Sequence, residues 1–191
     1  MMKPIENLLA EAISQSKNNM VSFMTKNKVW KEQWVLGKFV TLYNEKQTSG
    51  VQITYAKKLL ENELGDIHTP DFAVYNINRE LVAYVEITEA LDKERTRDAE
   101  YKSSKINTKG VEAIDEYDYF PLIQDRLNDK CKKLYPQKTW LVVYQNIFAS
   151  IYDDFPTSQL TTLQIPDENL FNQISILDSA GEQYINLCSK K

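Results

Sequence analysis

The stretch that decides the fold begins with Pro70-Asp71-Phe72-Ala73-Val74-Tyr75 and ends with Leu81-Val82-Ala83-Tyr84-Val85-Glu86-Ile87-Thr88. Both parts are rich in the aromatic and β-branched residues that favour strands. The segment between them, Asn76-Ile77-Asn78-Arg79, has the composition of a turn. The whole stretch therefore predicts a β-hairpin.

Two acidic residues interrupt this hairpin. Asp71 opens the first strand, and Glu86 lies near the end of the second, between Val85 and Ile87. A charge inside an apolar run needs a reason, because burying it without a partner is costly. Neighbouring strands lie about 4.8 Å apart, so we expect both carboxylates to reach one pocket. Clustered carboxylates of this kind need a divalent cation, a strong basic partner or raised pKa values.

The pair Pro70-Asp71 followed by Glu86-Ile87-Thr88 resembles the PD-(D/E)XK motif of the restriction-endonuclease-like superfamily. The resemblance covers residues 29–145 and implies an α/β fold, with a mixed β-sheet flanked by helices. It also implies a metal-dependent nuclease that hydrolyses DNA, in phage defence, restriction or repair. The cofactor would be Mg²⁺ or Mn²⁺, and Asp71, Glu86 and Thr88 would be catalytic. Thr88 stands where the family has a lysine, which leaves the source of that ammonium group open.

A third carboxylate is expected from the helix that we predict over residues 29–44. Glu32 precedes Val35 and Leu36 by three and four residues, which places it on the apolar stripe of that helix. The segment resembles the corresponding helix of an uncharacterised bacterial family in the same superfamily, so Glu32 becomes the third metal ligand beside Asp71 and Glu86. A first-turn glutamate favoured by the helix dipole is an equal alternative. Weaker candidates for this ligand are Glu45, Glu61 and Glu63.

The charged, helix-prone segment 89–105 is expected to supply the lysine that Thr88 replaces. Among its lysines, Lys102 is preferred as the group that positions the attacking water and stabilises developing charge. Lys102 and Lys105 are three residues apart and share a helix face. For each of them alone, a solvated helix face is the better interpretation.

Simpler interpretations exist for the other candidates. Asp71 could be an ordinary strand-start residue after proline, and Glu86 could face water from an edge strand. His68, the single histidine, could be a general base, but a loop histidine near a proline is more often incidental. The order Glu32, Asp71, Glu86 along the chain favours a site over these alternatives.

The whole chain of 191 residues is predicted to form one domain. Residues 1–28 would be an N-terminal helical appendage, residues 29–145 the core, and residues 146–191 C-terminal edge strands. The other predicted elements are a helix over 5–25, a strand over 51–55, a helix-prone segment over 56–64, a helix over 121–134, a buried strand over 139–144, a strand over 147–152, and a closing pair of strands over 173–177 and 184–188.

Composition limits the classes of function. The net charge of −4 and the pI of about 5.2 argue against extended phosphate contact through charge alone, although a local basic patch stays open. Cys131 and Cys188 lack any zinc-binding spacing and suit a reducing compartment. No signal peptide and no apolar run of bilayer length is visible. We therefore expect a cytoplasmic protein that makes no membrane contact.

Two further functions stay open beside the nuclease. The missing lysine and the acidic pI would also suit a catalytically degenerate binding or assembly module of the same fold. A structural homodimer with no role in nucleic-acid binding is the third possibility, and the many tyrosines would suit it. Salt-dependent DNA binding would argue against this third function.

Overall fold

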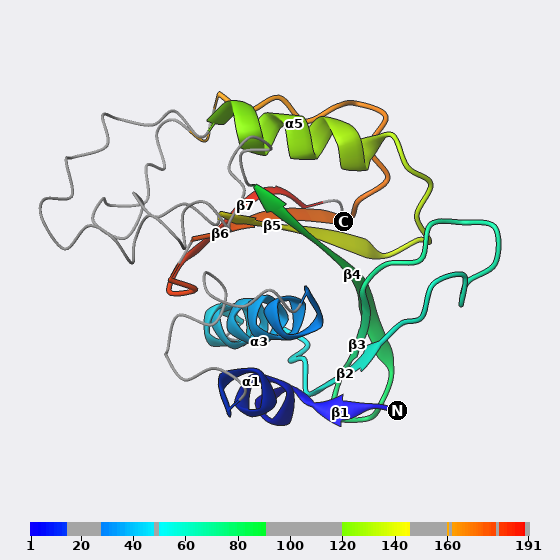
Figure 1. Ribbon diagram of the computed structural model, residues 1–191, viewed down its shortest axis with the longest axis vertical. Coiled ribbons are helices and arrows are strands. Elements are labelled where there is room, and N and C mark those ends of the chain that lie inside the picture. The colour runs from blue at the N-terminus through cyan, green and yellow to red at the C-terminus, as the bar shows by residue number, and fades with distance from the viewer. Residues whose placement is uncertain are drawn as a thin grey trace, which may run out of the picture.

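A computed structural model gives the structure of the chain, and it describes residues 1–14, 28–47, 50–90, 120–145, 160, 162–178 and 180–189. These residues form an α/β fold with a mixed sheet of seven strands and helices on both of its faces (Figure 1). The predicted class, α/β with a mixed sheet, is therefore confirmed.

The strands occur in the sheet in the same order as in the sequence. They are β1 (Lys3–Pro4), β2 (Tyr55–Lys58), β3 (Phe72–Tyr75), β4 (Leu81–Ala90), β5 (Thr139–Gln145), β6 (Gln173–Leu177) and β7 (Tyr184–Ser189). Strands β1 to β4 form an antiparallel meander, β5 and β6 are parallel to β4, and β7 returns antiparallel at the edge. Strand β4 is thus internal, with β3 on one side and β5 on the other.

Helices cover the two faces of this sheet. Helices α1 (Ile5–Ser14) and α3 (Lys28–Lys46) lie below the sheet in Figure 1, and α5 (Phe120–Cys131) lies above it. Each face has its own hydrophobic core. Val35, Phe39 and Val142 belong to the core under α3, whereas Ile123 and Leu127 belong to the core under α5.

The hairpin predicted from the sequence is confirmed as β3 and β4. Phe72 pairs with Val85 and Val74 with Ala83 in antiparallel register. The turn closes through the amide of Asn76, which donates to the carbonyl of Glu80 over 3.0 Å. The strand predicted over 139–144 and the closing pair of strands near the C-terminus are also present, as β5, β6 and β7.

The second strand lies later in the sequence than local residue preferences predict. Residues 56–64 have a helical composition, but Tyr55–Lys58 form β2 and residues 61–66 form turns, so the helix-prone interpretation is wrong. A strand was predicted over residues 51–55, but residues 51–54 are not in a strand, and β2 begins at Tyr55. The cause is pairing with β3, in which Ala56 faces Val74, because sheet context readily overrides weak local propensity.

Several predicted elements extend beyond the described residues. Helix α1 is described as far as Ser14, and residues 15–25 of the predicted first helix lie outside the described ranges. Glu89 and Ala90, predicted as helical, belong to β4, whereas residues 91–105 and the strand predicted over 147–152 lie outside as well. Within the described residues, no helix has both the length and the apolar character needed to cross a bilayer.

The N-terminal helix shares the core of the domain. Ile5, Leu8 and Ala12 of α1 belong to the same cluster of buried residues as Val35 and Phe39 of α3. The two helices approach closely at Gly37, where an added Cβ would stand 2.9 Å from the Cβ of Leu9. Glycine is therefore needed at this crossing for steric reasons.

Gly37→Ala is expected to lower the free energy of unfolding by about 1–2 kcal/mol, because the clash of an overpacked contact exceeds the gain in helix propensity. The nearest atom is a Cβ of Leu9, so shortening that side chain cannot relieve the clash. Urea unfolding would measure the effect. Gly50→Ala is the control, because the three atoms nearest to its new Cβ all belong to the flexible side chain of Gln47, which can move aside. A Gly37→Ala protein as stable as the wild type would contradict this account.

Candidate metal and acid–lysine site

Asp71 lies where β3 begins, next to β4. Its Oδ2 accepts a hydrogen bond of 2.8 Å from the amide of Ile87, so a side-chain carboxylate continues the ladder beyond the last strand pair, Phe72 with Val85. Glu86 precedes Ile87 on the same strand. The two carboxylates predicted to lie on neighbouring strands are therefore held at the same level of the sheet.

Glu32 is buried on α3, with a relative exposure of 5%. Its Oε2 accepts a 2.5 Å contact from the Nζ of Lys58, and the same ammonium group lies 3.2 Å from Oδ1 of Asp71. One lysine of β2 thus joins the carboxylate of the helix to that of the hairpin. The predicted place of Glu32 on the buried stripe is confirmed, since a solvated first-turn glutamate would be exposed.

Glu86 is buried on the central strand β4, with a relative exposure of 3%. Its Oε1 pairs with the ammonium group of Lys130 from α5, and Nε2 of His68 lies 3.6 Å away. Burial raises the pKa of Glu86 above its ordinary value, Asp71 raises it further, and Lys130 opposes the shift. The edge-strand interpretation of Glu86 is therefore wrong, because β4 has a neighbour on both sides.

We call Glu32, Asp71, Glu86, Lys58 and Lys130 the acid–lysine cluster. Lys28 adds a more exposed ammonium group 3.4 Å from Oε1 of Glu32, and that carboxylate is the main cause of the raised pKa of Lys28. Three carboxylates thus face three ammonium groups in the described part of the chain. The cluster combines oxygen donors with compensating positive charge.

A buried hydroxyl group adjoins the cluster. Tyr135 has a relative exposure of 6%, and its hydroxyl lies beside the Glu86 carboxylate without meeting any group of the described residues in full hydrogen-bond geometry. Burial raises the pKa of Tyr135, and the negative charge of Glu86 raises it further. Two residues before Asp71, the Oγ1 of Thr69 is also buried and has no hydrogen-bond partner within the described ranges. The side of the cluster next to Glu86 therefore includes a hydroxyl group besides the carboxylates and ammonium groups.

The lysines of the cluster differ from the lysine predicted. Lys102 lies outside the described residues, as do Lys93 and Lys105. Thr88 is nearly buried on β4 and offers a hydroxyl group in place of an ammonium group. The sequence does not point to Lys58, because the composition of residues 56–64 predicts a helix there. Lys130 could have been found, since it follows the buried Leu127 by three residues and thus lies on the apolar stripe of α5.

Of the remaining candidate residues, only His68 lies near the cluster in the described part of the chain. His68 reaches the cluster and also packs edge-on against Tyr135, with 4.9 Å between the ring centroids. Glu45, Glu61 and Glu63 are exposed, and Glu63 pairs with Lys57 at the surface. In the ranges that the structure covers, no three histidine, cysteine or acidic side chains stand close enough together to hold a metal ion. The three-carboxylate ligand set stays a prediction.

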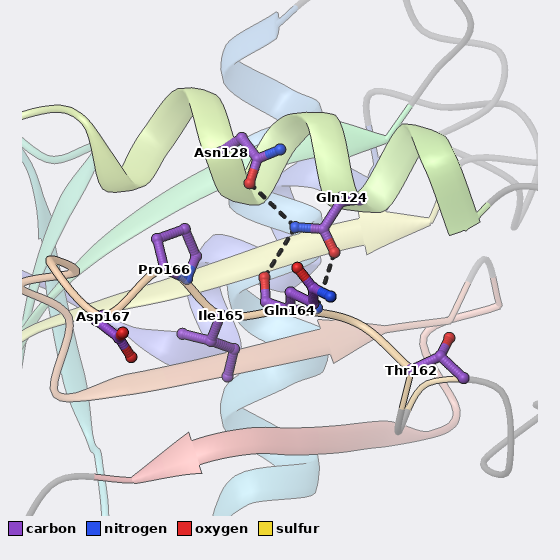
Figure 2. A pocket seen from close by; sticks show the side chains of 7 residues that line it. All are labelled: Gln124, Asn128, Thr162, Gln164, Ile165, Pro166 and Asp167. Carbon is purple, nitrogen blue, oxygen red and sulfur yellow. Dashed lines mark hydrogen bonds between the residues drawn. The ribbon is translucent and has the colours of Figure 1, made fainter.

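A separate pocket of about 510 Å³ lies between α5 and residues 162–167 (Figure 2). The amide of Gln124 bridges to the backbone of Gln164, with a donated hydrogen bond of 2.8 Å and an accepted one of 2.9 Å. The same Nε2 of Gln124 donates to Asn128 over 3.0 Å. These bonds attach the 162–167 segment to the helix. None of the predicted site residues lines this pocket, so it does not belong to the cluster.

Comparison with models of protein families, with curated proteins and with solved structures finds no match to this chain. Its function must therefore be argued from the cluster itself. The arrangement to be explained has a buried and a partly buried carboxylate on adjacent strands, a third carboxylate on a helix, and several lysines around them.

Proposed function

We propose that the chain is a metal-dependent nuclease of the PD-(D/E)XK type that hydrolyses phosphodiester bonds in DNA. The observation that carries this proposal is that the buried Glu86 and the partly buried Asp71 lie on neighbouring strands, close enough for the charge of Asp71 to raise the pKa of Glu86. Keeping two carboxylates side by side in a buried place is costly unless a cation joins them. Metal-dependent phosphoryl transfer uses such pairs.

The order of the elements supports the same proposal. Helix α3, the meander β2–β3–β4, helix α5 and the parallel strand β5 follow one another along the chain. The motif resemblance implies a helix, the hairpin, a later helix and a further strand in this order. The order of the elements supports only the fold, so the evidence for the reaction has to come from the side chains of the cluster.

The chemistry of the side chains fits Mg²⁺ or Mn²⁺. Asp71, Glu86 and Glu32 offer only oxygen atoms, which are the ligands that these hard cations prefer. The hydroxyl of Tyr135, which lies beside the Glu86 carboxylate, could bind a water molecule in the outer shell. When bound, the metal would polarise the phosphodiester and lower the pKa of a water molecule.

The residues of the chain have separate roles in this proposal. The amide of Ile87 fixes the Asp71 carboxylate through Oδ2, which leaves Oδ1 for a cation. Lys130 holds Glu86 in place from α5. The buried surroundings of Glu32 and Glu86 strengthen the electrostatic interactions of both carboxylates.

The test is cleavage of duplex DNA, single-stranded DNA and RNA by the full chain, with Mg²⁺, Mn²⁺ or EDTA. We expect cleavage of DNA that requires the divalent ion and is lost in EDTA. Asp71→Asn, purified in parallel, controls for a contaminating nuclease. Absence of metal-dependent cleavage on all three substrates would refute the nuclease proposal.

A second function is favoured by one specific observation. Each carboxylate of the cluster has an ammonium partner, so the described side chains are electrically balanced without a metal. That balance suits a catalytically degenerate binding or assembly module. Calorimetric titration with Mn²⁺ separates the two functions, because the module would release no binding heat and the nuclease would bind the ion.

A further inference from the structure

Lys58 occupies the place in the cluster where a cation would bind. Its Nζ lies 2.5 Å from Oε2 of Glu32 and 3.2 Å from Oδ1 of Asp71. The other oxygen of Asp71, Oδ2, is already taken by the amide of Ile87. A metal ion that binds Asp71 through Oδ1 must therefore compete with Lys58.

We propose that Lys58 is the internal counter-cation of the cluster: a divalent metal displaces its ammonium group from Asp71, and the displaced ammonium binds the phosphate of the substrate. This inference rests on the proposed nuclease function and assigns to β2 the positive group that Thr88 cannot supply on β4.

Comparison with the other lysines singles out Lys58. The side chain of Lys130 is 17% exposed and pairs with Glu86 beneath α5, so it is held in place. Lys28 is 83% exposed and reaches only Glu32 among the described carboxylates. Lys58 is 31% exposed and touches carboxylates from two different elements. It is thus the ammonium group that can both bridge the acids and turn toward solvent.

A second contact holds the Lys58 side chain at the cluster. Its Nζ lies 4.5 Å from the centroid of the Phe72 ring, which is a favourable distance for a cation–π contact. Phe72 is buried and immediately follows Asp71. When a metal takes Oδ1 of Asp71, this ring can keep the ammonium near the reacting phosphate.

The experiment compares Lys58→Met with the wild type by calorimetric titration with Mn²⁺ and by thermal denaturation with and without Mn²⁺. Methionine keeps an unbranched side chain but removes the charge. We expect Mn²⁺ to bind Lys58→Met roughly ten-fold more tightly, because the competing charge is gone. Without metal the variant should melt at a lower temperature than the wild type. Mn²⁺ should raise the melting temperature of the variant again, because it binds the folded state. Cleavage should nevertheless be slower.

Two further variants make the comparison specific. Lys57→Met removes the same charge from the adjacent position of β2, where the lysine pairs with Glu63 at the surface. Its Mn²⁺ affinity should equal that of the wild type. Lys58→Arg keeps the positive charge, so its Mn²⁺ affinity should stay near that of the wild type and part of the cleavage rate should be retained.

The outcomes separate this inference from the proposed function. If the wild type binds Mn²⁺ and cleaves DNA but Lys58→Met has unchanged Mn²⁺ affinity, the counter-cation role is wrong and the nuclease stands. If neither the wild type nor Lys58→Met binds Mn²⁺, both proposals fail. If only Lys58→Met binds the ion, competition by Lys58 is supported directly.

Discussion

Lys130→Met is expected to lower the free energy of unfolding by about 3 kcal/mol at neutral pH, because it leaves the buried carboxylate of Glu86 without its ammonium partner. The side chain of Glu86 is 4% exposed, so water cannot take the place of Lys130. Chemical denaturation followed by tryptophan fluorescence would measure the loss. The exposed Lys132 provides the control, since Lys132→Met should change stability by no more than about 0.5 kcal/mol.

The loss should depend on pH in a defined direction. Burial and Asp71 raise the pKa of Glu86, whereas Lys130 lowers it, so removing Lys130 lifts the pKa in the folded state farther above its value in the unfolded chain. Between these two values the folded state binds more protons, and the free energy of unfolding falls as pH rises. The deficit should therefore be larger at about pH 8 than at about pH 5.

The double variant Glu86→Gln/Lys130→Met tests the same interaction independently. It removes the buried charge together with its partner, so most of the lost stability should return. If the double variant is as unstable as Lys130→Met, then packing of the lysine stem, rather than the unpaired charge, causes the loss.

The hairpin and its two carboxylates could be predicted because their signals are local. Strand composition on both sides of a turn defined β3 and β4, and Glu86 stood out as a charge inside an apolar run. The burial of Glu32 followed from the 3.6-residue period of the helix, which links it to Val35 and Leu36. The prediction for Glu32 concerns which face of a helix a residue occupies, and periodicity determines that directly.

Periodicity could place Lys130 on the apolar stripe of α5, but it could not show which carboxylate each lysine of the cluster meets. Lys58 joins Glu32 and Asp71 only because β2 pairs with β3, and local composition assigned that segment to a helix. Lys130 reaches Glu86 because α5 crosses the face of β4. Contacts between residues distant in the sequence depend on sheet pairing and helix placement, which a single sequence indicates only weakly. The sequence alone therefore predicts the ammonium group in the segment after Thr88, not in β2 or α5.

Asp71→Asn is expected to reduce metal-dependent cleavage and Mn²⁺ affinity by at least about a hundred-fold, while the fold is retained. Asparagine keeps a side-chain oxygen that can accept the hydrogen bond from the amide of Ile87, so the junction of β3 and β4 should persist. What disappears is the negative charge next to Glu86. Loss of a direct ligand should exceed the ten- to hundred-fold effects, roughly, that follow removal of outer-shell partners.

Asp66→Asn is the matched control, because it makes the same chemical change at an exposed position of the loop that leads to Asp71. Cleavage rate, calorimetric Mn²⁺ affinity and melting temperature should be measured for both variants and the wild type. An Asp71→Asn protein that keeps its Mn²⁺ affinity would exclude Asp71 as a ligand. If melting temperature and cleavage fall together while the metal still binds, the carboxylate supports the strand junction and not the chemistry. The neutral amide separates these roles because it preserves the shape of the side chain and removes only its charge.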